Sequence, residues 1–134
     1  MATLSYPKPR ASLVKLASFV GNVATAQELM VLPKDAVIAG VYILGAANAT
    51  AAATDTTVAV AGGSDADGIV IAYNLETGGA GYNTVGAQAG VLVGTKLTVD
   101  TVVSATLSAA VAGDAALSWT LKIEYYIPGP GESL

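Results

Sequence analysis

The sequence lacks the side chains on which most enzyme and metal chemistry depends. It contains no cysteine and no histidine among its 134 residues, so it has no disulfide framework, no thiolate nucleophile and no imidazole to serve as general base or metal ligand. An enzyme would need paired carboxylates or a serine–lysine pair instead. We therefore expect a non-enzymatic protein with no catalytic residue, no metal and no cofactor. Several acids lie in predicted turns, where aspartate is favoured for local hydrogen bonding, namely Asp65, Asp67, Asp100 and Asp114.

Charge is also scarce and unevenly placed. Charged residues make up 12% of the chain, about half the usual share, which favours an oligomer whose subunits cover one another. Residues 1–34 hold four basic residues and one acid (+3), whereas residues 35–134 hold two basic residues and nine acids (−7). No basic patch combines with aromatics, so we expect no nucleic-acid partner. The uncharged stretch 36–54 ends in small and polar residues, so we expect no membrane partner either.

The clearest structural signal is period-two alternation near the C-terminus. Over residues 116–127 apolar side chains alternate with others for twelve residues, which predicts a half-buried strand and excludes an amphipathic helix. Residues 101–108 alternate in the same way. A hairpin loop over residues 109–114 is predicted to join the two strands. The predicted core of the last strand consists of Leu117, Trp119, Leu121 and Ile123.

Shorter patterns predict the remaining elements. Strands are expected at 12–20, 36–44, 56–61 and 69–75, with one or two more within 91–99. The 36–44 strand is apolar enough to be covered on both faces, and Ile69, Ile71, Tyr73 and Leu75 are predicted to share one face. Residues 25–31 fit either a helical turn or a strand, and residues 76–90 are predicted to form a long loop. Seven or eight strands with a turn signal about every ten residues predict an all-β fold, an antiparallel two-sheet sandwich of jelly-roll type.

Proline spacing divides the chain into three parts. Residues 1–11 are predicted to be an extended arm, because Pro7 and Pro9 bias the backbone away from helix. Residues 12–127 form the sandwich domain, and residues 128–134, which open with Pro-Gly-Pro-Gly, form a C-terminal tail. The arm residues expected to contact a partner protein or a neighbouring subunit are Tyr6, Pro7, Lys8, Pro9 and Arg10.

Aromatic residues supply a second set of candidates. Trp119 and Tyr125 fall on the apolar face of the last predicted strand and are expected in the core. Tyr82 and Tyr126 do not, and we expect them to be exposed or to lie at an interface.

Several segments resemble small structural proteins of tailed bacteriophages. They are LPKDAVIAGVY at 32–42, TVAVAGGSDADGIV at 57–70, the strand at 100–109 and the terminal strand that ends in EYYI at 124–127. The family they resemble is the jelly-roll head decoration, or cement, proteins, which typically form trimers on icosahedral capsids. The resemblance implies a homotrimer that is made in the host cytoplasm, binds the major capsid protein and decorates the outer surface of the virion.

Similar strings also occur in proteins described as phage head or tail fibres. The alternative function is therefore a recognition module that binds host-surface glycans through Tyr82 and the loop at 78–90.

Overall fold

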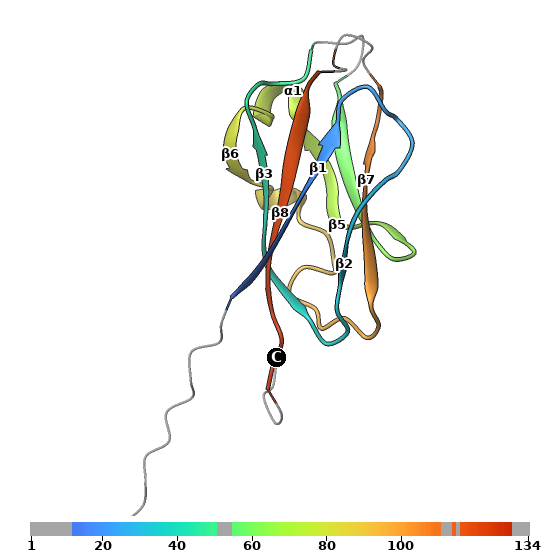
Figure 1. Ribbon diagram of the computed structural model, residues 1–134, viewed down its shortest axis with the longest axis vertical. Helices are drawn as coiled ribbons and strands as arrows, with labels where there is room; N and C mark the ends of the chain where they lie inside the picture. The colour runs from blue at the N-terminus through green and yellow to red at the C-terminus, as the bar shows by residue number, and fades with distance from the viewer. Residues whose placement is uncertain (1–11, 51–54, 111–113, 115, 130–134) are drawn as a thin grey trace, which may run out of the picture.

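The computed structural model describes residues 12–50, 55–110, 114 and 116–129. Within them the chain forms two four-stranded antiparallel sheets packed face to face, with strands running along the long axis of the molecule (Figure 1). One short helix, α1 (Leu75–Gly78), and one 3-10 turn, η1 (Gly86–Gln88), accompany them. The strands are β1 (Leu13–Val20), β2 (Gln27–Leu32), β3 (Val37–Gly45), β4 (Thr57–Gly62), β5 (Asp65–Asn74), β6 (Gly81–Thr84), β7 (Thr101–Leu107) and β8 (Ser118–Tyr126).

The order of the strands is that of a jelly roll. One sheet runs β1-β8-β3-β6 and the other runs β2-β7-β4-β5. The pairs β1·β8, β2·β7, β3·β6 and β4·β5 are all antiparallel, so the chain pairs like one long hairpin centred on the β4–β5 turn. That hairpin is rolled until β3 also lies beside β8 and β4 beside β7. The predicted all-β, jelly-roll-type sandwich is confirmed.

The core lies between the two sheets and is centred on β8. Trp119, Leu121 and Ile123 are buried there as predicted, and Leu117 is half-buried against them. The Trp119 ring packs 5.8 Å from that of Phe19, and its Nε1 donates to the carbonyl of Ala47 at 2.9 Å. The one polar atom of this large side chain is therefore satisfied inside the fold.

The predicted hairpin between the last two long strands is wrong. β7 belongs to one sheet and β8 to the other, so the segment between them crosses the sandwich. Asp114 in this connection is fully buried and does not form a solvated turn. Its carboxylate accepts from the backbone N of Thr50 at 3.0 Å and from the Thr50 hydroxyl. A buried carboxylate needs such partners, and they tie the crossover to the end of the sandwich.

The predicted long loop at 76–90 and the predicted strands at 91–99 are also wrong. The first segment contains α1, β6 and η1, and β6 adds a fourth strand beside β3. The second segment contains turns and isolated bridges at Val93 and Lys96. These bridges reach Ile38 and Val37 of β3. Leu92, Val93 and Leu97 pack against the core, whereas Val91 and Val99 are exposed, so the segment covers part of the core instead of extending a sheet.

Irregular strand pairing accounts for further differences between the predicted strands and the structure. The β4–β5 register shifts between Val58 and Val60, so Ile69 and Val70 are both buried while Ile71 turns outward and does not share the face of Ile69. β3 is buried on its inner face and half-buried on its outer face, and Ala39, at the register shift with β8, is its only exposed residue. The ambiguous segment at 25–31 becomes strand β2, which pairs with β7.

Candidate functional site

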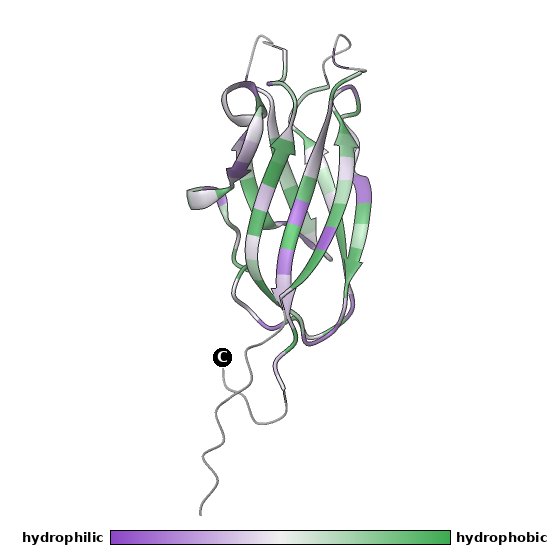
Figure 2. Cartoon of the chain, turned by 60° about the vertical axis from the view of Figure 1, so that its left-hand side comes forward, coloured by the Kyte–Doolittle hydropathy of each residue, from purple (hydrophilic) through white to green (hydrophobic). Residues whose placement is uncertain are grey.

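The outer face of the β1-β8-β3-β6 sheet gathers aromatic, apolar and paired charged side chains. On neighbouring strands Leu16 is paired with Lys122, and Lys122 with Tyr42. Tyr82 projects from the edge strand β6, where it is paired with Leu44. Figure 2 shows the hydrophobic and hydrophilic bands that alternate along these strands. We call the set Leu16, Tyr42, Tyr82, Lys122 and Glu124 the tyrosine face.

Two stacked rings form the centre of this face. The rings of Tyr42 and Tyr82 lie 5.2 Å apart between centroids and are inclined by 28°. Gly40 makes the room for Tyr42, since a Cβ at that position would come within 2.8 Å of the Tyr42 hydroxyl. Tyr82 keeps 55% of its surface exposed. The pair therefore offers a ring surface that is held in place before any partner binds.

Lys122 fixes the orientation of both rings. Its Nζ donates to the Tyr82 hydroxyl at 2.8 Å, lies 3.2 Å from Glu124 Oε1 and sits 5.2 and 5.0 Å from the centroids of Tyr42 and Tyr82. The hydrogen bonds to Tyr82 and then to Glu124 raise the pKa of Lys122. Glu124 Oε2 also accepts from the Tyr42 hydroxyl at 3.5 Å. The charges of Lys122 and Glu124 cancel, and the hydrogen-bonded cluster favours the protonated form of Lys122.

Strand β1 extends the tyrosine face with apolar surface. Val14 is 48% exposed and Leu16 is 60% exposed, and β1 lies at the edge of its sheet, beside β8. Strand β1 therefore places exposed aliphatic side chains beside the aromatic rings of the same sheet face.

Within the described ranges, no group of three or more acids, histidines or cysteines is placed to hold a metal ion. The helices described here include none that is long and apolar enough to span a bilayer.

The predicted contact residues differ in where they lie in the structure. The arm residues Tyr6–Arg10 all lie outside the described part of the chain. Tyr82 lies on the tyrosine face, whereas Tyr126 is half-buried at the end of β8, paired with Val37. The roles of Lys122 and Glu124 were missed. Their signal was present, because both fall on the polar side of the strict alternation at 116–127.

The comparisons with known proteins bear on the fold. No family model and no curated protein matches the chain. Chains of solved structures do match, among them two from phage capsids. One is a chain in the acidic stable capsid structure of Helicobacter pylori bacteriophage KHP30, with a TM-score of 0.67 and 20% identity over 90% of this chain and 92% of that one. Another is a chain in the capsid asymmetric unit of cyanophage Pam1, with a TM-score of 0.70 and 21% identity over 96% of this chain and 93% of that one.

The fold is shared. Nearly the whole of this chain superimposes on nearly the whole of each neighbour, so the jelly roll is common to all three chains as a complete unit.

Proposed function

We propose that the chain is a structural protein of a bacteriophage virion, which acts by binding and not by catalysis. The observation that carries this proposal is the likeness of the entire jelly roll, over at least 90% of every chain compared, to chains from two phage capsids. The tyrosine face adds support, since its groups are suited to contact and include no histidine or cysteine.

In finer terms, the chain is a decoration protein of the outer capsid surface. Synthesised in the host cytoplasm, it binds the major capsid protein as a homotrimer and stabilises the assembled shell. Residues Tyr6, Pro7, Lys8, Pro9 and Arg10 contact the capsid or a neighbouring subunit. The arm carries two basic residues and no acid, whereas residues 35–134 carry a net charge of −7, so the arm suits an acidic surface.

Binding to capsids that lack this protein tests the proposal. The purified full chain should bind them, and deletion of residues 1–10 should weaken binding at least tenfold while the domain, whose first strand begins at Leu13, stays folded. The matched control replaces Lys8 and Arg10 with glutamine. That change should have a smaller effect, because exposed charges are screened by salt and most affinity should come from Tyr6 and the prolines. Failure of the full chain to bind any capsid would overturn the decoration role.

A second candidate is a fibre-type module that binds host-surface glycans. The stacked pair Tyr42–Tyr82, with Tyr82 more than half exposed, favours it, because such rings bind the apolar faces of sugars. Host-cell binding that is lost in Tyr82→Ala and kept in Tyr82→Phe would support this candidate. Unchanged binding in Tyr82→Ala would exclude this site.

A further inference from the structure

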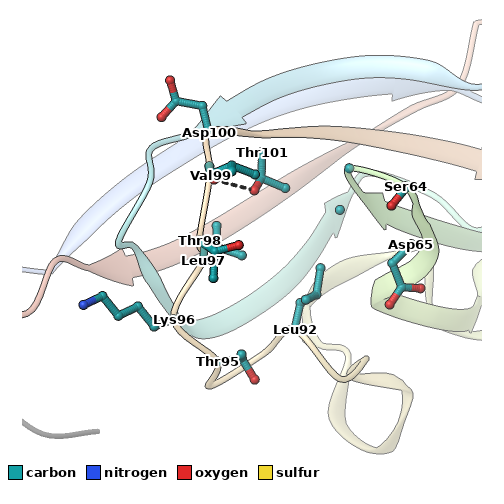
Figure 3. A pocket seen from close by; sticks show the side chains of 12 residues that line it. Ser64, Asp65, Leu92, Thr95, Lys96, Leu97, Thr98, Val99, Asp100 and Thr101 are labelled. Atoms are coloured by element: carbon teal, nitrogen blue, oxygen red, sulfur yellow. Dashed lines mark hydrogen bonds between the residues drawn. The ribbon is translucent and has the colours of Figure 1, made fainter.

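A pocket of about 300 Å³ lies between the β4–β5 turn and the segment that precedes β7 (Figure 3). Leu92 and Leu97 supply apolar surface, and hydroxyl groups such as that of Ser64 line the wall. Figure 3 shows Asp65 and Leu92 near each other in the wall of the pocket, and both side chains approach Gly68. A volume of this size lies at the lower end of the range for ligand pockets and accommodates one or two side chains.

One charge in the pocket is available to a ligand. Figure 3 shows the side chains of Lys96 and Asp100 directed away from the hollow. Lys96 lies 3.7 Å from Asp35, and Asp100 accepts from the backbone N of Lys34 at 2.8 Å. In the described part of the chain, the Asp65 carboxylate has no such side-chain partner. An unpaired carboxylate beside leucine side chains suits a cation on an aliphatic stem, above all a guanidinium.

The arm enters the fold at the same end of the sandwich. Leu13 at the start of β1 is paired with Tyr125, and Tyr125 with Ile38. The carbonyl of Ile38 accepts from the backbone N of Gly94 at 2.9 Å, beside the pocket wall. Eleven residues precede Ser12, and an extended chain of that length spans roughly 36–40 Å. An arm can therefore reach a second copy whose pocket end lies nearby.

We propose that residues 6–10 of a neighbouring copy dock at the pocket, with the Arg10 guanidinium inside it on Asp65 and the prolines of the arm against Leu92. The proposal rests on the arm's assignment to subunit contacts under the proposed function. Charge complementarity carries it: the arm holds Lys8 and Arg10 without an acid, and the pocket holds an unpartnered acid. Prolines restrict the free arm and so lower the entropy lost on docking. Each copy offers one arm and one pocket, a head-to-tail contact that can close into a ring.

Thiol cross-linking tests the exchange directly. The chain has no cysteine, so the introduced thiols are the only ones. A tagged Lys8→Cys copy is mixed with an untagged Ser64→Cys copy, and a short bifunctional maleimide is added. The expected product is a tagged–untagged heterodimer, formed at least fivefold more than with Ser18→Cys, an exposed control position on β1. No heterodimer above the control level would overturn the proposal. So would a cross-link that forms only within one chain of the Lys8→Cys/Ser64→Cys double variant, since the arm would then fill its own pocket.

Charge reversal identifies the ion pair. Adding Asp65→Arg to the pocket copy or Arg10→Asp to the arm copy should each lower the cross-link yield at least fivefold, and mixing the two reversed copies should restore it. Asp67→Arg is the matched control on the same strand, outside the pocket lining, and should leave the yield unchanged. Equal losses with Asp67→Arg and no restoration would overturn the Arg10–Asp65 assignment.

Capsid binding by the unmodified chain separates the two proposals. Binding without cross-linking leaves the virion role intact and removes the arm exchange. Cross-linking without capsid binding supports the arm exchange and removes the decoration role.

Discussion

Trp119 is the residue on which the core most depends. It is almost fully buried, contacts Phe19 and makes a hydrogen bond through its only polar atom. Trp119→Ala should lower the free energy of unfolding by about 3–5 kcal/mol, as for other large buried aromatics. Urea unfolding monitored by circular dichroism measures the change. Tyr82→Ala is the control and should cost less than about 1 kcal/mol, because Tyr82 is mostly exposed. Similar losses in both variants would contradict this view of the core.

Two raised pKa values predict how stability depends on alkaline pH. Burial raises the pKa of Tyr73 above 10.0, and hydrogen bonds to Tyr82 and Glu124 raise that of Lys122 above 10.5. Both groups hold their protons more tightly in the folded state, so their contributions are complete below the unfolded values and are lost as pH rises through the folded values.

The urea midpoint should therefore stay constant up to about pH 9 and fall above about pH 10. Tyr73→Phe and Lys122→Met should each flatten the fall. A fall of the same size in both variants would assign the pH dependence to other groups.

At the scale of elements, alternation predicted the long strands and failed where the chain is irregular. Strands β1, β7 and β8 could be found because alternate residues of each are more buried than their neighbours. β6 is four residues long and begins at Gly81, so it has too little pattern to detect. The bulge in β5 that turns Ile71 outward depends on pairing with β4, which no local pattern reports.

A substitution at Gly90 tests how the segment after η1 is held against β5. A Cβ at Gly90 would lie 2.3 Å from the carbonyl oxygen of Asp67, a backbone atom that cannot easily move. Gly90→Ala should therefore destabilise the fold by about 1–3 kcal/mol. It should also speed amide exchange at Leu92, whose N donates to the carbonyl of Gly68 at 2.8 Å. Hydrogen exchange measures this, with the exposed Ala87→Ser as control. Slow exchange at Leu92 in Gly90→Ala would show that the segment is held by other contacts.

For the whole molecule, composition and turn spacing were enough to predict a two-sheet sandwich, but not its crossovers. A short connection can close a hairpin or cross between sheets, and the residues at 109–114 do not distinguish the two. The same limit applied to the tyrosine face. Tyr82 was predicted to be exposed because it lies off the apolar face of the last strand, whereas Tyr42 and Lys122 meet it only because β6 pairs with β3 and β3 with β8.

The last prediction concerns assembly. A chain with 12% charged residues that exposes Val14, Leu16 and Tyr82 on one sheet face should cover that surface with other copies. Light scattering at micromolar concentration should give about three times the 13.2 kDa of one chain, the homotrimer that the family resemblance implies. Leu16→Glu places a charge in the middle of the exposed apolar surface and should weaken association at least tenfold, whereas Ala87→Glu, also exposed but on η1, should not. A monomeric mass for the unaltered chain would contradict self-assembly. A trimer that persists in Leu16→Glu would move the subunit contact away from the tyrosine face and leave the arm and its pocket to hold the copies together.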